Sequence, residues 1–342
     1  MEPAAQRRAP TAAVYLDDWL AHVKGRVRQK TWMGYESHIR NYAKPHLGDA
    51  LVTDLEVLDI QGLYSALLRR TPPLSGGTVL NLHSVLTQAF SQAVRWGYLP
   101  VSPVSGAQPP RARRREPMII DEKATATILE AAKGTRLEAP VAIAIATGMR
   151  RGEILGLRWS DMDADWTLLR VRRSLQTADG LRFEDPKTRR SRRTVALPEF
   201  LRTYLRRQHE DQFRRREKLG KRWNENDLVI DKGDGSPLNP DTLSSSWWYF
   251  CRAHDLPKIR FHDLRHAHAT LMLLQGVHPK IVSERLGHAS IGLTLDTYSH
   301  VLPAMQEEAV RAFDALFPPE DRAVHGPEAD LTPSGQEALF PD

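Results

Sequence analysis

The stretch Arg260-Phe261-His262-Asp263-Leu264-Arg265-His266-Ala267-His268-Ala269-Thr270 concentrates chemically active side chains on a predicted helix. His262 and Arg265 are three residues apart, which places them on one helix face at its first turn. A titratable ring beside a fixed cation can hold one anionic ligand. The segment therefore predicts an anion-binding site at a helix start.

Other interpretations of the same stretch remain open. His262 and His266 could bind zinc, although Asp263 replaces the Glu of an H-E-x-x-H pattern and Arg265 would repel the metal. The histidines could instead form a structural cluster. The helix could also pair with the next one, residues 279–287, as a helix-turn-helix without catalysis.

A second candidate is Thr147-Gly148-Met149-Arg150-Arg151-Gly152-Glu153, between two helical runs. Gly148 permits a tight turn, and Arg150 emerges at the next helix start. An arginine there adds its donors to free backbone N–H groups, a favourable setting for phosphate. The alternative is an exposed Arg150 that pairs with Glu153 on the helix surface.

Three more side chains follow the same order along the chain. Lys187, in Pro186-Lys187-Thr188, is expected at a hairpin tip, where it could reach a site or remain one more solvated charge. His288 follows a helix-ending turn in Leu286-Gly287-His288-Ala289-Ser290, and Tyr298 lies ten residues later. A lone tyrosine is more often a packing residue.

The surrounding pattern predicts mainly α structure with a small antiparallel β-sheet (α+β). Residues 11–100 have helical periodicity, with Asp54 as a candidate N-cap and Gly97 as a helix end. Residues 101–117 form a proline- and arginine-rich linker. Residues 118–317 mix helices with three short strands, expected at 168–175, 181–184 and 194–197. Residues 1–10 and the acidic 318–342 are tails.

Charge and composition narrow the class of protein. The 342 residues carry a formal charge of +6, but the acidic tail accounts for −5, so residues 1–317 carry +11. This excess indicates a polyanionic partner. No run of about 18 apolar residues and no signal peptide is present, and Cys251 is the single cysteine. A cytoplasmic, nucleoid-associated protein without a membrane partner is expected.

Taken together and in this order along the chain, these residues indicate one protein family. Arg150 in T-G-x-R-R-x-E, Lys187, His262-x-x-Arg265, Leu286-Gly287-His288 and Tyr298 in T-Y-S-H resemble the catalytic domain of tyrosine recombinases, the phage-integrase family. The resemblance covers about residues 117–317. The bundle at 11–100 looks like that family's SAM-like core-binding domain, on pattern and order rather than on a sharp motif.

The resemblance implies a mechanism without cofactor, metal or ATP. Tyr298 would attack a DNA phosphate, leaving a 3′-phosphotyrosine and a free 5′-hydroxyl, and His262 would accept the phenol proton. The phosphate would be held by two arginines and a histidine, namely Arg150, Arg265 and His288. Lys187 would protonate the departing 5′ oxygen.

Supporting and DNA-contacting residues are expected around these. Glu153 would orient an arginine. Two basic runs would contact backbone phosphates. They are Arg111, Arg113, Arg114 and Arg115 in the linker, and Arg189, Arg190, Arg192 and Arg193 after Lys187.

The resemblance also implies partners. These are double-stranded attachment or recombination sites, a homo-tetramer on DNA through a C-terminal helix around 303–317, and accessory excision or host DNA-bending factors. About ten residues precede the first helix, so the protein works without arm sites or starts further upstream. A phage or mobile-element integrase is favoured over a chromosome-dimer resolvase. The rivals are a helix-turn-helix regulator and a type IB topoisomerase.

Overall fold

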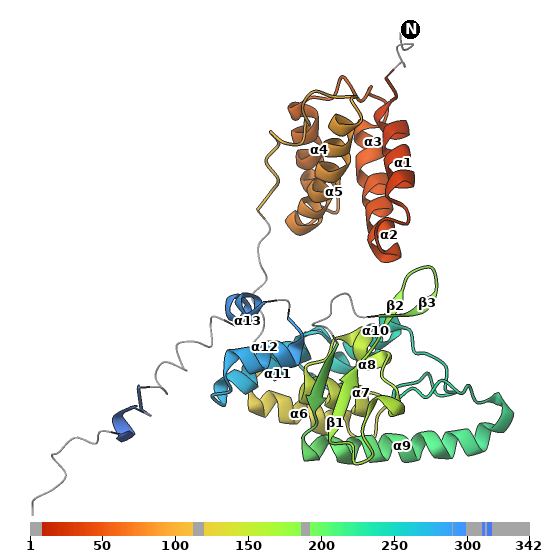
Figure 1. Cartoon of the computed structure of the whole chain (residues 1–342), viewed down its shortest axis with the longest axis vertical. Coiled ribbons are helices and arrows are strands. Elements are labelled where there is room, and N and C mark those ends of the chain that lie inside the picture. The colour runs from red at the N-terminus through yellow and green to blue at the C-terminus, as the bar shows by residue number, and fades with distance from the viewer. Residues whose placement is uncertain are drawn as a thin grey trace, which may run out of the picture.

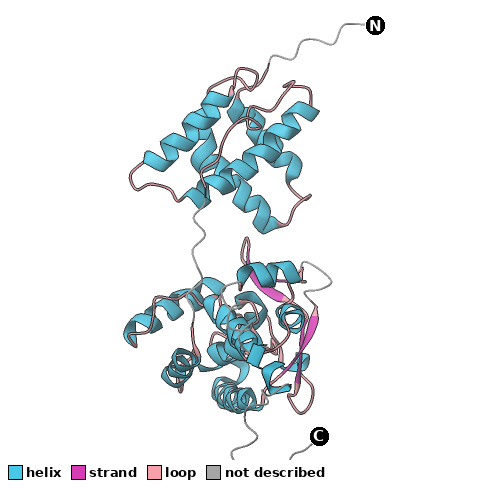
Figure 2. Cartoon of the chain, turned by 90° about the vertical axis from the view of Figure 1, so that its left-hand side faces the viewer, coloured by secondary structure: helices cyan, strands magenta, loops and turns pink. Residues whose placement is uncertain are grey.

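The computed structural model describes residues 9–111, 120–185, 192–288, 290–298, 310–311 and 313–316. Helices build most of the chain, in two bodies that follow one another in sequence (Figure 1). The described strands lie along one edge of the second body (Figure 2). This agrees with the expected α+β class. Within the described ranges, no helix is both long and apolar enough to cross a membrane.

The first body is a helical bundle with its own core. Its elements are α1 (Ala12–Val23), α2 (Gln29–His38), the π-helix η1 (Ile39–Ala43), α3 (Lys44–Leu47), α4 (Val57–Arg69) and α5 (Gly76–Arg95). The apolar stripes of these helices converge on buried aromatic side chains, including Tyr15, Trp19 and Phe90. The core continues to Ala107, beyond the expected bundle end at residue 100.

Of two expected helix boundaries in this body, the structure confirms one and corrects the other. Gly97 has a φ of +78° directly after α5, the left-handed conformation that ends helices, so that prediction is confirmed. Asp54 does not cap α4. Glu56 occupies that position, and its backbone N–H donates to Asp59 Oδ2 at 2.9 Å. The capping box that Glu56 and Asp59 form therefore starts the helix two residues after Asp54.

The second body surrounds a nearly all-apolar helix. Its helices are α6 (Glu122–Ala132), α7 (Glu138–Thr147), α8 (Arg151–Leu155), η2 (Trp159–Asp161), α9 (Glu199–Leu219), η4 (Gly220–Arg222), α10 (Pro240–Ala253), α11 (Asp263–Leu274), α12 (Pro279–Leu286) and α13 (Ile291–Thr297). Nine of the ten residues of α7 are buried, from Ala139 to Thr147. Such a helix forms a body's centre because every face is apolar.

In the part of the chain that the structure describes, four short strands form two antiparallel pairs. β1 (Leu168–Val171) pairs with β4 (Arg193–Ala196), and β2 (Ser174–Thr177) pairs with β3 (Leu181–Glu184). The single strand expected at 168–175 is therefore divided at residues 172–173. The expected strands at 181–184 and 194–197 correspond to β3 and, within one residue, to β4.

Helix α8 lies close against β2 because of a glycine. A Cβ on Gly152 would lie 2.5 Å from Ser174 Oγ and 2.6 Å from Leu175 O. A larger residue would push helix and strand apart. This close approach fixes the helix start that carries Arg150 next to the sheet.

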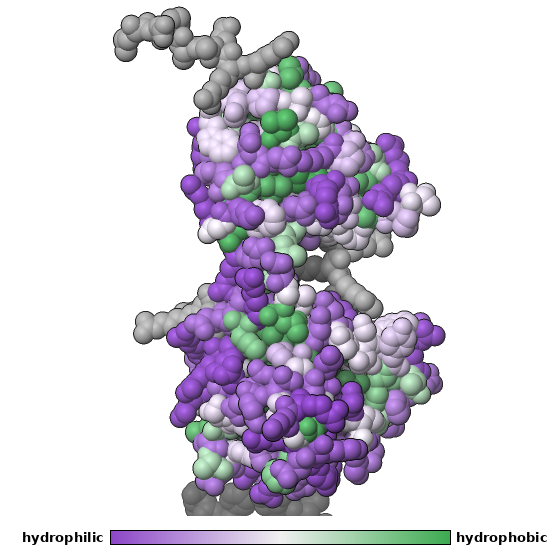
Figure 3. Space-filling view, turned by 90° about the vertical axis from the view of Figure 1, so that its right-hand side faces the viewer, coloured by the Kyte–Doolittle hydropathy of each residue, from purple (hydrophilic) through white to green (hydrophobic). Residues whose placement is uncertain are grey.

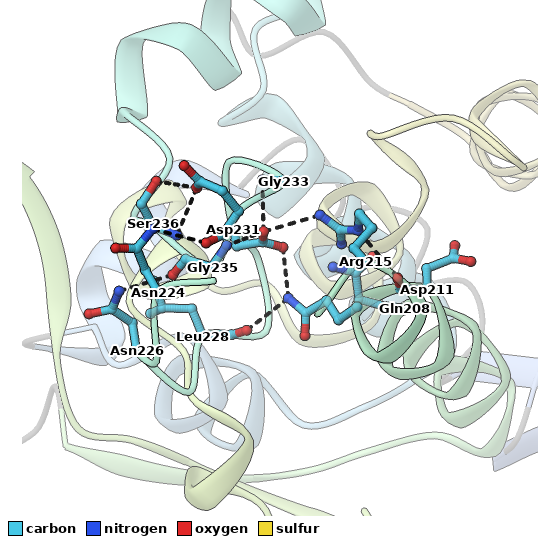
Figure 4. A network of polar contacts seen from close by, with 12 residues as sticks. Gln208, Asp211, Arg215, Asn224, Asn226, Leu228, Asp231, Gly233, Gly235 and Ser236 are labelled. Atoms are coloured by element: carbon cyan, nitrogen blue, oxygen red, sulfur yellow. Dashed lines mark hydrogen bonds and ion pairs between the residues drawn. The ribbon is translucent and has the colours of Figure 1, made fainter. Parts of the chain in front are cut away.

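Helix α9 and the loop after it form a unit on the side of the body opposite to the bundle (Figure 1). Asp231 joins them (Figure 4). Its carboxylate accepts hydrogen bonds from Gly233 N at 2.7 Å, Gly235 N at 3.0 Å, Gln212 Nε2 at 2.8 Å and Arg215 Nη1 at 3.1 Å. A carboxylate with this many donors organises the loop, so the network is structural.

The two bodies meet where the β2–β3 hairpin reaches α2. Arg28 Nη1 lies 3.3 Å from Glu184 Oε2, and Lys30 Nζ donates to Gln176 Oε1 at 3.4 Å. On this side of the molecule hydrophilic residues predominate over both bodies, broken by small apolar patches (Figure 3). Exposed polar contacts of this kind contribute little free energy. The bodies are therefore held together weakly at this point.

Candidate active site

Arg150 stands at the N-terminus of α8, and Glu153 holds it there. Arg150 is the N-cap residue, and Gly148 before it has a φ of +64°. Its backbone N–H donates to Glu153 Oε2 at 2.9 Å and its Nη1 to Glu153 Oε1 at 2.9 Å. Arg150 Nη2 also donates to Gly287 O at 3.3 Å. The guanidinium is thereby fixed between α8 and the α12–α13 turn, with 40% of its side chain exposed.

Arg265 approaches the same place from α11 and is buried. Its Nη1 donates to Gly148 O at 2.6 Å and its Nη2 to Leu286 O at 2.8 Å. Burial, reinforced by the nearby charge of Arg150, lowers the pKa of Arg265 to about 9. The side chain remains a cation at neutral pH. Its buried position also means that the α11 face carrying it is not a free recognition surface, contrary to the helix-turn-helix interpretation.

Arg193 corrects one expectation. It was expected to contact backbone phosphates, but only 6% of its side chain is exposed. Its Nη1 and Nη2 donate to the two oxygens of Glu153 at 3.2 and 2.9 Å, and its Nε donates to Arg285 O at 2.6 Å. Sequence patterning misplaced it because the residue sits in an arginine run, while its strand position turns it inward.

Glu153 is ionised in this setting. Burial by itself would raise its pKa, but the charge and hydrogen bonds of Arg193, followed by those of Arg150, outweigh burial and lower the pKa. Arg285 lies on the other side of Arg193 and donates to Ala146 O at 2.8 Å. Glu153 accepts hydrogen bonds from Arg150 and Arg193, while Arg265 and Arg285 donate to backbone carbonyls. In the described part of the site, four guanidinium groups therefore gather around the Glu153 carboxylate.

Helix α13 connects the remaining groups. Its residue Thr294 places Oγ1 2.8 Å from His288 Nδ1, and Tyr298, at its C-terminal cap, places Oη 2.9 Å from His266 Nδ1. Thr294 and Tyr298 are both buried and four residues apart, hence on one face. Burial, together with the charges of Arg265 and Arg150, lowers the pKa of His288 to about 4. Its imidazole is neutral at pH 7.

The environment of Tyr298 keeps its phenol protonated. Its side chain is 1% exposed. Burial raises the pKa of Tyr298 to about 12, although the nearby Arg265 acts in the opposite direction. A reaction at its oxygen therefore needs a proton acceptor.

His262 occupies a different position from His266. It is the N-cap residue of α11 and is exposed, lining a hollow of about 160 Å³ with Arg150, Gln176 and Lys30. Burial of its inner side, with His266 and Arg265 close by, lowers the pKa of His262. Within the described ranges, no group of three or more His, Cys, Asp or Glu could hold a metal ion. The zinc interpretation therefore finds no further ligand there.

The structure brings together five of the six residues expected to carry the chemistry. They come from the α7–α8 turn, from α11 and from the segment between α12 and the end of α13, and they are Arg150, His262, Arg265, His288 and Tyr298. The sixth, Lys187, lies outside the described residues, as do Arg113, Arg114, Arg115, Arg189 and Arg190. Arg111 and Arg192 are exposed.

Several features of the site were not predicted from the sequence. His266 was considered only as a zinc ligand or structural residue, although it stands inside the opening stretch. Thr294 gave no signal in the sequence. An open basic groove of about 610 Å³ beside β1 and β4 was also missed, lined by Arg170, Arg172, Arg173, Arg192 and others. Arg170, Arg172 and Arg173 stand in one short stretch, Arg170-Val171-Arg172-Arg173, which was not singled out from the sequence, and the fold brings Arg192 beside them.

Comparison with known proteins agrees with this geometry. Residues 119–305 match the model of the "Phage integrase family", and residues 13–68 match "Phage integrase, N-terminal SAM-like domain". A "Tyrosine recombinase XerC-like" protein of Caldanaerobacter subterraneus subsp. tengcongensis is 31% identical over 320 residues, covering 87% of this chain and 81% of that protein.

Two kinds of solved structure share the fold. The Tn1549 transposon integrase in complex with a circular intermediate DNA superposes with a TM-score of 0.76 at 19% identity, covering 89% of this chain and 100% of that one. A lambda integrase tetramer bound to a Holliday junction gives 0.63 at 20% identity, covering 85% and 78%. With a family model matching more than half of its residues, the chain belongs to the phage integrase family of tyrosine-type site-specific recombinases.

Proposed function

We propose that this chain cuts and rejoins DNA strands at specific sites through a 3′-phosphotyrosine formed on Tyr298. The observation that carries the proposal is the convergence of a buried phenol with an excess of guanidinium groups. A phosphate diester in the cleft would supply the missing negative charge, and the same cations would stabilise the charge of its transition state.

The roles follow from exposure and contacts. Arg150, partly exposed and held by Glu153, would bind a non-bridging oxygen of the phosphate. Arg265 would add charge from beneath, and the neutral His288 would donate a hydrogen bond. Lys187 is proposed, on the family resemblance, as the acid that protonates the departing 5′ oxygen.

The two bodies would close around duplex DNA. Lys30 of the bundle and Arg150 of the second body line the same hollow. The groove containing Arg192, together with the exposed Arg111, would extend contact along the backbone. Binding through several phosphates makes affinity fall steeply with salt.

The biological setting is proposed from relatives. The transposon integrase bound to a circular intermediate supports integration or excision of a mobile element. The lambda integrase tetramer on a Holliday junction supports a homo-tetramer on two DNA sites, joined through residues around 303–317. In the described part of this segment Val310, Phe313 and Leu316 are exposed. Accessory excision and DNA-bending factors are proposed on the resemblance alone.

A nicked suicide duplex tests the central step. Duplexes tiled across the DNA that flanks the gene are incubated with the full chain, and covalent adducts are detected on denaturing gels. We expect one tile to give an adduct with wild type, and Tyr298→Phe to abolish it while duplex binding, measured by anisotropy, stays within about twofold.

Two outcomes would contradict the proposal. Binding to a tile without any adduct would favour a non-catalytic regulator, and an adduct formed by Tyr298→Phe would exclude this nucleophile. Relaxation of any supercoiled plasmid, without site preference or strand exchange, would favour a topoisomerase. Cleavage should persist in excess EDTA and without ATP.

A further inference from the structure

The nearest described partner of the Tyr298 oxygen is a histidine that sequence patterning did not place in the reaction. A phenol that attacks phosphorus must lose its proton, so the group in contact with its oxygen decides where the proton goes. His266 Nδ1 lies 2.9 Å from Tyr298 Oη, and the two ring centroids are 5.8 Å apart. This is hydrogen-bonding distance, and it exists before DNA is bound.

His262, the expected acceptor, is placed for another task. It is exposed toward the hollow that Arg150 also lines, where the phosphate would enter. Its ring stands perpendicular to that of His266, with centroids 5.3 Å apart. His266 therefore neighbours both the tyrosine and the cleft-facing histidine.

Building on the proposed function, we propose that His266 is the base that takes the proton from Tyr298 during cleavage. Its Nε2 carries the ring proton, so that Nδ1 accepts the phenol O–H. As the Tyr298 oxygen bonds to phosphorus, its O–H bond breaks and the proton moves to Nδ1. The bond from phosphorus to the 5′ oxygen breaks with its electron pair, and that oxygen is protonated by the acid of the site.

Rejoining reverses the transfer. A 5′-hydroxyl attacks the phosphotyrosine, the bond between phosphorus and the tyrosine oxygen breaks, and the imidazolium of His266 returns its proton to that oxygen. The base thus begins and ends each cycle neutral. His262 would then be free to contact the phosphate or the 5′ oxygen.

Charged and titratable neighbours surround His266 on several elements. Arg265 and Asp263 come from its own helix, α11, and His262 from the cap of that helix. His288 approaches from the segment after α12, and Tyr298 from α13. Asp263, as an anion close to the ring, would stabilise the imidazolium that forms when His266 accepts the proton.

One measurement needs no DNA. Nitrogen-15 correlation spectra of histidines in the full chain report which ring nitrogen carries the proton. We expect His266 in the Nε2–H form, and we expect its Nδ1 shift to move in Tyr298→Phe, while the exposed His46 is unaffected. A protonated Nδ1 at pH 8 would overturn the proposal, because the ring would then donate to the phenol oxygen.

The second measurement uses the duplex that gives an adduct with wild type. His266→Asn keeps a hydrogen-bond acceptor near Oη but cannot take a proton. We expect its single-turnover cleavage to fall by about 10²- to 10⁴-fold. When sulfur replaces the 5′ bridging oxygen, the leaving group needs no acid. This substrate should restore cleavage by Lys187→Ala but not cleavage by His266→Asn.

Two rescues distinguish a base from a structural role. A fluorinated tyrosine at position 298, whose phenol is more acidic, should recover part of the His266→Asn loss, and imidazole should recover part of the His266→Ala loss. Cleavage by His266→Asn within about twofold of wild type, or its restoration by the sulfur substrate, would refute the proposal. If wild type itself forms no adduct, the proposed function is refuted. The spectra still show which ring nitrogen of His266 carries the proton.

Discussion

Single residues at this site take their properties from burial. His268 shows the effect most strongly. It is 6% exposed, and its Nδ1 donates to Ile145 O at 2.7 Å while its Nε2 accepts from Arg285 Nε at 3.2 Å. Burial, with the charge of Arg285, lowers the pKa of His268 to about 3. The ring is a neutral link between α7, α11 and α12.

Acid should therefore destabilise the second body. The folded pKa of His268 lies below the unfolded value, so its contribution is complete above about pH 6.5 and is lost as the pH falls toward the folded value. Between pH 7.5 and 5, His268 alone should cost about 2 kcal/mol of unfolding free energy. The lowered pKa values of His262 and His288 act in the same direction.

Urea unfolding followed by tryptophan fluorescence at the two pH values checks this. His268→Asn keeps a donor near the Nδ1 position, so it should lower stability at pH 7.5 but show a smaller loss on acidification than wild type. His46→Asn, at an exposed position, is the matched control and should keep the wild-type loss. An unchanged loss in His268→Asn would contradict the assignment.

Among the secondary-structure elements, helices were predicted correctly where the hydrophobic periodicity agrees with the residues that start and end a helix. Helix α12 begins and ends where expected, at Pro279 and Leu286, because proline opens it and Gly287 closes it with a φ of +67°. Helix α13 was missed. Its sequence Ile-Gly-Leu-Thr-Leu-Asp-Thr alternates apolar and polar residues and includes glycine, a pattern typical of a strand. Tertiary contacts through Thr294 and Tyr298 hold it helical.

Helix α13 should position two side chains of the site together, that of His288 through Thr294 and that of Tyr298. Thr294→Val keeps the shape of the side chain but removes the hydroxyl beside His288 Nδ1. We expect suicide-duplex cleavage to fall by about tenfold, because His288 would lose its fixed orientation and a buried polar atom would lose its partner. Thr294→Ser, which retains the hydroxyl, should stay within about threefold of wild type. Equal losses in both variants would mean that the methyl group, and not the hydrogen bond, matters.

For the whole molecule, the residues that could be foreseen are those whose spacing is local. Arg150, His262 and Arg265 stand at helix starts, which a sequence reveals. The inward turn of Arg193 and the contact of His266 with Tyr298 depend on segments 40 and 32 residues apart. No local pattern encodes such approaches, because they arise only when α8, α11, α13 and β4 pack together.

The contact between the two bodies also joins segments that are far apart in the sequence. Among the described residues it includes the exposed polar pairs Arg28–Glu184 and Lys30–Gln176, and the hollow beside Arg150 has a volume of about 160 Å³, far less than a duplex needs. The bodies must therefore separate before DNA enters. Breaking exposed pairs costs about 1 kcal/mol or less each, so opening is cheap.

Cross-linking this contact should close the molecule to DNA. Arg28→Cys with Glu184→Cys provides two exposed thiols for a short bismaleimide. Cys251 is 3% exposed, and burial raises its pKa to about 11, so it should not react. We expect protein cross-linked before mixing to lose duplex affinity by at least about tenfold, and prior binding of duplex to slow the cross-link. Each single-cysteine variant treated with the same reagent is the control and should bind normally. If the cross-linked double variant binds duplex as tightly as those controls, the bodies do not part at this contact, and DNA must enter the site from another side.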